Sequence, residues 1–88
     1  MSPTFQIHYF STATSYTGKQ TEHLPAPLPL VELFPLLESQ YPGITEAVLR
    51  SCSISVREEY VDVDGEEGRE VVIAEGDEVA VIPPVSSG

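Results

Sequence analysis

The sequence has very few cationic residues and almost no cysteine. Its 88 residues include only four lysines and arginines against fourteen aspartates and glutamates, a formal net charge of −10. This balance argues against non-specific nucleic-acid binding and against binding to anionic membranes, because both depend on Lys and Arg contacts with phosphate. The natural complement is a basic protein partner. The one cysteine, Cys52, cannot form an internal disulfide, so no disulfide framework is expected.

Long apolar runs and targeting signals are also missing. No stretch approaches the roughly 20 apolar residues that span a membrane, and the first residues lack the basic and apolar regions of a signal peptide. We therefore expect a soluble, cytoplasmic protein. A single small domain of this length buries only about 60–65% of its unfolded surface, which leaves little room for an enclosed active site. Binding a partner suits such a domain better than enclosing a substrate.

The motifs of a self-contained enzyme are absent from the sequence. It contains no Ser-His-Asp arrangement, glycine-rich phosphate loop or paired-carboxylate motif. His8 and His23 have no companion ligands at metal spacing, so no metal site is predicted. Residues 62–66 match only the start of a calcium loop and lack its later ligands. We expect Cys52 to be a small buried hydrophobic residue rather than a nucleophile.

The hydrophobic pattern predicts strands on both sides of one main helix. Alternation of apolar and polar residues indicates a strand over residues 4–10, and residues 19–24 suit a second strand antiparallel to it. Apolar residues at helical spacing over residues 30–41 predict the helix, and Pro42 and Gly43 end it. Further strands are expected at residues 52–57, 70–74 and 78–82, and residues 60–63 either extend the first of these or begin another.

The connecting segments are predicted from their turn-forming residues. Residues 11–18 and 64–68 are expected to be turns, and residues 44–51 to add a short helical turn. The three prolines at positions 25, 27 and 29 are expected to prevent any strand pairing there. Pro35 fits the helix if it lies in the first turn and kinks it otherwise. The order predicts an α+β roll with the helix across one face of the sheet.

The C-terminal end of the chain is unusual. An apolar strand over residues 78–82 runs into the rigid step Pro83-Pro84, then a few small residues, then a final glycine. Gly88 offers the least hindered carboxylate that a polypeptide can present, and the fixed φ of the prolines reduces the entropy lost when such a tail is threaded into a pocket. We therefore divide the chain into a folded domain over residues 1–84 and a flexible tail over residues 85–88.

With this element order and tail, the chain resembles the ubiquitin-like β-grasp sulfur carriers, the family that includes molybdopterin synthase small subunits. The resemblance rests on residues 56–61, Val-Arg-Glu-Glu-Tyr-Val, and on residues 76–86, Gly-Asp-Glu-Val-Ala-Val-Ile-Pro-Pro-Val-Ser. It extends over essentially the whole chain and is weakest over residues 11–29. It implies a mixed sheet gripping one helix, with a free C-terminal tail.

The resemblance also implies a function for the tail. Gly88 would be adenylated by a ubiquitin-activating-type enzyme that uses ATP and magnesium, converted to a thiocarboxylate by a sulfur donor, and used to transfer sulfur to a cyclic pyranopterin precursor. The tail, Pro83, Pro84, Val85, Ser86 and Ser87, would insert into the large subunit of a heterotetrameric synthase, which holds the catalytic side chains. No permanently bound cofactor is implied, and Phe10, Tyr60 and Ile82 are candidates for the docking surface.

One position departs from the family pattern, and two other functions remain open. Such carriers typically end in Gly-Gly, whereas this chain ends in Ser87-Gly88, so either serine replaces the penultimate glycine or a final glycine is missing. A ubiquitin-like modifier joined to target lysines through Gly88 would need the same adenylation. An acidic adaptor domain with an inert tail is the third possibility. Ile82 has the further alternative of being an ordinary core residue, and Phe10 that of covering the end of its strand locally.

Overall fold

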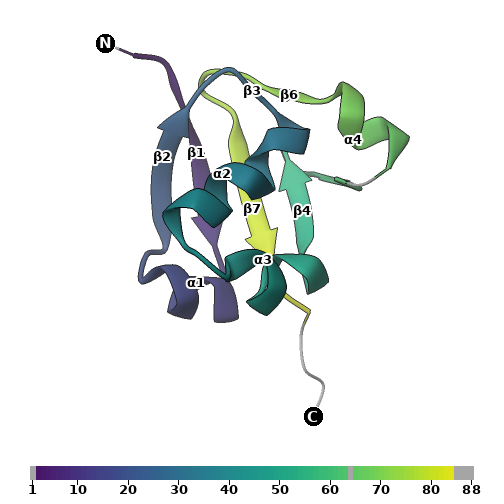
Figure 1. Cartoon of the computed structure of the whole chain (residues 1–88). Coiled ribbons are helices and arrows are strands. Elements are labelled where there is room, and N and C mark those ends of the chain that lie inside the picture. The colour runs from purple at the N-terminus through teal and green to yellow at the C-terminus, as the bar shows by residue number, and fades with distance from the viewer. Residues whose placement is uncertain (1, 64, 85–88) are drawn as a thin grey trace.

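The computed structural model describes residues 2–63 and 65–84, which form a five-stranded mixed sheet with helices on one face (Figure 1). The strand order is β2-β1-β7-β4-β5. The strands are β1 (Thr4–Tyr9), β2 (Thr21–Pro25), β4 (Ser53–Val56), β5 (Glu59–Val61) and β7 (Glu78–Ile82). β1 and β7 run parallel, and the other neighbours are antiparallel. The predicted ubiquitin-like β-grasp is confirmed.

A layer of helices covers one face of this sheet. The short 3-10 helix η1 (Leu30–Glu32) continues directly into α2 (Leu33–Gln40), the main helix, and α3 (Ile44–Ala47) and η2 (Leu49–Ser51) follow it. Figure 1 shows α2 lying across the strands. The core between the layers is formed by alternate strand residues and the inward face of the helices. Its fully buried members include Phe5, Ile7, Leu24, Leu30, Leu33, Leu37, Ile44, Leu49, Ile73, Val79 and Val81.

The main helix begins and ends as its sequence requires. Pro35 is the third residue of α2, where the missing N–H has no intrahelical partner to lose, so of the two alternatives the position in the first turn is the one observed. After α2 the chain turns at Gly43, which has a φ of 91°. The Glu38 carboxylate then accepts hydrogen bonds from the N–H groups of Gly43 at 2.6 Å and Thr45 at 3.0 Å, which begins α3. These backbone hydrogen bonds lower the pKa of Glu38.

The prediction of a turn over residues 11–18 was wrong. This segment contains the helix α1 (Thr12–Thr17), which Gly18 ends in a left-handed conformation. The helix buries Ala13, and the Thr14 hydroxyl donates to the carbonyl oxygen of Tyr9 at 2.7 Å. A single buried residue in a polar segment gives no helical periodicity, so the sequence carried little signal for it.

Two further predictions need correction. The prolines do not prevent pairing, because Pro25 is the last residue of β2 and β3 (Leu28–Pro29) forms a two-stranded ladder with β6 (Val72–Ile73). Proline lacks only the N–H donor and can occupy the end of a strand or a short ladder. The second correction concerns the predicted turn over residues 64–68 and strand over residues 70–74. They are largely replaced by the helix α4 (Glu66–Glu70), which leaves β6 only two residues long.

Candidate functional site

The strand that leads to the C-terminus lies in the middle of the sheet. β7 pairs in parallel with β1 and antiparallel with β4, and Val79 and Val81 are fully buried beneath the helices. The N–H of Phe10 donates to the carbonyl oxygen of Val81 at 3.3 Å, and Ile82 pairs with Ser53. The strand is therefore paired on both sides up to Val81, and on the β4 side up to its last residue, Ile82.

The ladder stops where the two prolines begin. Pro83 is buried and Pro84 is exposed, and neither has an N–H to extend the pairing. In Figure 1, β7 ends at the same end of the molecule as α1 and α3. The other residues predicted for the tail, Val85, Ser86, Ser87 and Gly88, lie outside the described residues. The described part of the chain thus provides a rigid base from which that segment starts.

The three residues predicted to contact a partner share one face of the sheet. The register places His8, Ala80, Ser55 and Tyr60 side by side across four strands, on the face opposite the buried valines of β7. Because side chains alternate along a strand, Ile82 lies on the same face as Ala80. Phe10 directly follows β1, and its N–H bond to the carbonyl oxygen of Val81 continues the pairing by one residue, which places Phe10 on the side of His8. Ser53, opposite Ile82, completes this set. We call the surface formed by Phe10, Ser53, Ser55, Tyr60, Ala80 and Ile82 the outer face.

The outer face carries exposed apolar groups separated by small side chains. Tyr60 is 71% exposed and Phe10 is 49% exposed, while Ile82 is half-buried and does not belong to the core. The residues between these apolar groups have short side chains that extend little from the sheet; they are Ser53, Ser55 and Ala80. Aromatic side chains left open to solvent beside small residues are typical of surfaces that bind other proteins.

The outer face has a polar boundary at β1 and β2. Nε2 of His8 lies 2.9 Å from a carboxylate oxygen of Glu78, and its Nδ1 lies 3.2 Å from the hydroxyl of Thr21. A carboxylate can only accept, so Nε2 carries a proton and donates to Glu78. Both ring nitrogens of His8 are therefore engaged with side chains of the neighbouring strands.

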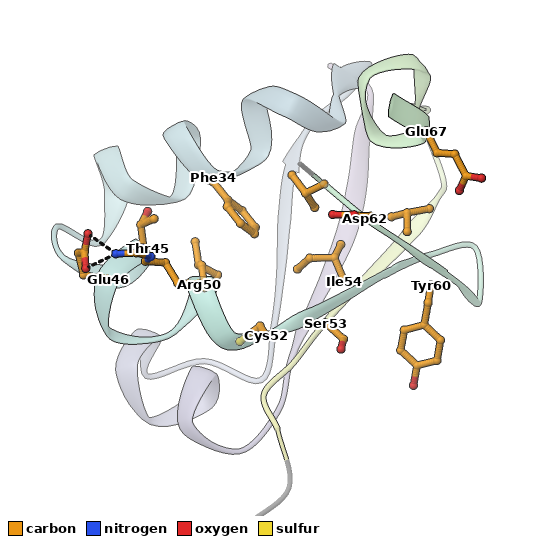
Figure 2. A pocket seen from close by; sticks show the side chains of 13 residues that line it. Phe34, Thr45, Glu46, Arg50, Cys52, Ser53, Ile54, Tyr60, Asp62 and Glu67 are labelled. Carbon is orange, nitrogen blue, oxygen red and sulfur yellow. Dashed lines mark hydrogen bonds and ion pairs between the residues drawn. The ribbon is translucent and has the colours of Figure 1, made fainter. Parts of the chain in front are cut away.

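A groove lies on the helix side of the sheet. It has a volume of about 920 Å³ and is bounded by α2, α3, η2 and the strands β4 and β5. Figure 2 shows Phe34, Ile54 and Asp62 within it, and the Arg50 guanidinium paired with the Glu46 carboxylate at one end. The Cys52 thiol lines it and donates to the carbonyl oxygen of Val48 at 3.0 Å. Burial raises the pKa of this thiol, which favours the unreactive protonated form.

A cluster around Glu22 was missed by the sequence reasoning. The hydroxyls of Tyr9 and Tyr41 donate to one carboxylate oxygen of Glu22 at 2.8 and 2.9 Å, and Nζ of Lys19 donates to the other at 3.1 Å. Burial alone would raise the pKa of Glu22, but the three hydrogen bonds outweigh it and lower the pKa. The tyrosines lie 13 and 19 positions from Glu22 in the sequence, so no local spacing indicated their contact.

Within residues 2–63 and 65–84, no group of three or more His, Cys, Asp or Glu side chains could hold a metal ion. Over the same residues, no helix is long and apolar enough to cross a membrane.

Comparison with known proteins identifies the family. The ThiS family matches residues 7–88. The molybdopterin synthase sulfur carrier subunit of Aspergillus niger is 67% identical over 87 residues, which cover 99% of this chain and 97% of that protein. The protein of the same name from Emericella nidulans is 65% identical over 89 residues, which cover 97% of this chain and 98% of that protein.

Solved structures agree on the fold. The small archaeal modifier protein 1 of Methanosarcina acetivorans has a TM-score of 0.75 at 18% identity and covers 100% of this chain and 99% of its own. A protein–protein complex of subunits 1 and 2 of the molybdopterin-converting factor of Helicobacter pylori contains a similar chain. The TM-score is 0.65 at 16% identity, and the match covers 97% of this chain and 99% of that one. By its family match and its nearly full-length relatives, the chain belongs to the ThiS family, in the group of molybdopterin synthase sulfur carrier subunits.

Proposed function

We propose that this chain carries sulfur on Gly88 for molybdenum cofactor biosynthesis. A ubiquitin-activating-type enzyme adenylates the Gly88 carboxylate with ATP and Mg²⁺, and a sulfur donor displaces AMP to leave a thiocarboxylate. The chain itself holds no resident cofactor in this scheme. Adenylation matters because a free carboxylate is a poor electrophile, whereas the mixed anhydride with AMP is a good one. Glycine adds no side chain to hinder the nucleophile.

The proposed acceptor of the sulfur is a cyclic pyranopterin precursor bound by the large subunit of the synthase. That subunit holds the catalytic side chains, and the small chain is a co-substrate that is recharged. We place the assembly in the cytoplasm as a heterotetramer with two small subunits at opposite ends of a large-subunit dimer. The Helicobacter pylori complex of the two converting-factor subunits supports a stable contact of this kind.

The position of β7 is the observation that carries the proposal. Its core-facing residues anchor the strand beneath the helices, while Ala80 and Ile82 of the same strand form part of the outer face. A partner that binds the outer face therefore meets the segment after Ile82 at a fixed place. Because Pro83 and Pro84 have restricted φ angles, little further freedom is lost at the base of the tail on docking.

The docking step can be tested with outer-face variants. We expect Tyr60→Ala and Phe10→Ala each to weaken binding to the large subunit by about tenfold or more, since exposed aromatic residues often dominate interfaces. Val31→Ala is the matched control, because Val31 is 43% exposed but lies on η1, among the helices. Titration calorimetry measures the affinities. Equal affinities for all four proteins would contradict the proposed docking surface.

The chemistry of the tail is tested by the intact mass of the chain after incubation with the activating enzyme, ATP, Mg²⁺ and a sulfur donor. We expect the change that corresponds to one oxygen replaced by sulfur, and its loss when Gly88 is deleted. Ser87→Gly and a glycine-extended chain serve as controls. Conversion of these controls alone would show that the Ser87-Gly88 ending disables the tail. No conversion of any of them would refute the proposal.

A ubiquitin-like modifier function is the second candidate. The likeness of the fold to a small archaeal modifier protein favours it, and attachment through Gly88 would require the same adenylation. The two functions differ in the nucleophile that attacks the glycyl adenylate, which is a sulfur donor in one case and a lysine amine in the other. Isopeptide-linked conjugates of this chain in cell extract, located by mass spectrometry, would support the modifier.

A further inference from the structure

The chain holds a single side-chain amine. Lys19 is the only lysine among its 88 residues, and the other three cationic residues are Arg50, Arg57 and Arg69. A guanidinium stays protonated at all physiological pH values and has no free lone pair for acylation, whereas a lysine that loses its proton is a good nucleophile. Any reaction of an activated carboxylate with a side-chain amine of this protein must therefore occur at Lys19.

Lys19 is exposed but firmly held. It lies between α1 and β2, and 51% of its side chain is accessible. Its Nζ donates to Oε1 of Glu22 at 3.1 Å and lies 5.9 Å from the centre of the Tyr41 ring. The other oxygen of Glu22 accepts from both tyrosine hydroxyls, of Tyr9 and Tyr41, and only 13% of the Glu22 side chain is exposed. The carboxylate is thus fixed by the core before it contacts the amine.

These contacts oppose nucleophilic attack by Lys19. An amine attacks through its lone pair, which is absent from the ammonium form that Glu22 and the Tyr41 ring stabilise. The hydrogen bond to Glu22 and then the interaction with Tyr41 raise the pKa of Lys19, in agreement with the geometry. The amine is therefore open to solvent yet largely withheld from reaction.

The location of Lys19 brings it to the end of the sheet from which the tail starts. Thr21 of β2 and Ala80 of β7 both pair with His8, so they lie two strand spacings apart, about 10 Å. Lys19 precedes Thr21 by two residues, and Ile82 follows Ala80 by two residues. Because β2 starts at the end where β7 finishes, the amine and the base of the tail are on the same side of the molecule.

We propose that Lys19 is the one side-chain amine of this chain that an activated carboxylate can acylate, and that Glu22, held by Tyr9 and Tyr41, suppresses this reaction. The relevant acyl donor is the glycyl adenylate, so this part rests on the proposed function. In the suppressed reaction, Nζ forms an amide bond with the Gly88 carbonyl carbon, the bond from that carbon to the AMP oxygen breaks, AMP leaves and the Nζ proton passes to solvent. Suppression keeps the activated tail available for its sulfur donor.

An enzyme-free experiment tests the suppression by itself. The full chain is treated with the acetyl ester of N-hydroxysuccinimide, and acetylation of Lys19 is followed by peptide mass mapping. We expect Glu22→Gln to react about two- to fivefold faster than the original chain, the range that corresponds to loss of an exposed ion pair. Glu32→Gln, which removes a charge on η1, is the matched control and should leave the rate unchanged.

A second variant keeps the test valid if Glu22→Gln fails to fold. Tyr41→Phe leaves the Glu22 carboxylate and its charge in place but removes one of the hydrogen bonds that hold it. It should also accelerate acetylation of Lys19, by less than Glu22→Gln, while circular dichroism confirms the fold. Rates equal to that of the original chain for both variants would overturn the proposed suppression.

The glycyl adenylate is tested with the activating enzyme, ATP and Mg²⁺, with the sulfur donor withheld. Release of pyrophosphate reports adenylation. If no pyrophosphate is released, the proposed function is refuted, and the acetylation rates alone then test whether Glu22 suppresses the reaction of Lys19. When adenylation occurs, Glu22→Gln should accumulate amide-linked products at Lys19, each with the mass loss of one water, and Lys19→Arg should form none. Adenylation without Lys19-linked product in Glu22→Gln, or with amides located elsewhere, would overturn the assignment.

Discussion

Replacement of Gly43 by alanine gives a direct test of the packing around the end of the main helix. Gly43 has a φ of 91°, and a side chain in this region costs roughly 1–2 kcal/mol. A Cβ there would also lie 2.7 Å from the hydroxyl oxygen of Tyr16. That hydroxyl donates to the carbonyl oxygen of Pro42 at 2.7 Å, so moving it removes a hydrogen bond that contributes about 0.5–1.5 kcal/mol. The expected total loss is about 1.5–3.5 kcal/mol.

The free energy of unfolding from urea titration, followed by circular dichroism, measures this loss. Gly18→Ala is the matched control, because Gly18 has a similar φ of 76° but no atom lies within 4 Å of the point that a Cβ would occupy there. Gly18→Ala should therefore show only the backbone cost. The difference between the two variants isolates the displacement of Tyr16.

A double-mutant cycle with Tyr16→Phe separates the two contributions further. Tyr16→Phe removes the hydroxyl, so Gly43→Ala in that background should cost only the backbone strain. The cycle should then give a coupling of about 0.5–1.5 kcal/mol. If Gly43→Ala is no more costly than Gly18→Ala, or if the cycle shows no coupling, the reasoning about Tyr16 and Pro42 is wrong.

Three further predictions concern the core, the Glu22 cluster and the thiol. Leu37→Ala should lower the free energy of unfolding by about 2–5 kcal/mol because Leu37 is fully buried, whereas Val31→Ala on the surface should change it little in the same urea titration. Because the pKa of Glu22 is lowered from its ordinary value of 4.5, the ionised carboxylate stabilises the fold at pH values above 4.5, and this stabilisation is lost as the pH falls through the lowered pKa. In an acid titration, the free energy of unfolding of Glu22→Gln should therefore fall less steeply with pH than that of the original chain. Burial raises the pKa of Cys52, so iodoacetamide should alkylate it more slowly in the native chain than in urea.

Strong periodic patterns in the sequence were enough to predict the central elements. The alternation of Phe5, Ile7 and Tyr9 and that of Val79 and Val81 correspond to buried strand faces, and the apolar stripe from Leu30 to Leu37 corresponds to the buried face of the main helix. These signals are reliable because each repeats several times with one period, and the burial of one face requires that repetition.

The remaining elements have no periodic apolar pattern in the sequence. α1 buries only Ala13 and is held by the bond from the Thr14 hydroxyl to the carbonyl oxygen of Tyr9. The ladder of β3 with β6 joins residues more than forty positions apart. The Glu22 cluster leaves no local pattern either, because it combines the ends of β1, β2 and α2. The exposure of Phe10 was predictable, because an aromatic residue on the polar side of a strand has no core to join.

The alternation of side chains along β7 links the stability of the fold to the display of the tail. Val79 and Val81 fix the strand by burial, and this choice of register places Ala80 and Ile82 on the outer face. A slip of one residue would exchange the two sets, exposing the valines and burying Ala80 and Ile82. The pairing with β1 on one side and β4 on the other therefore fixes the outer face relative to the point where β7 ends. A partner that recognises Phe10, Tyr60 and Ile82 together thereby recognises where the tail begins.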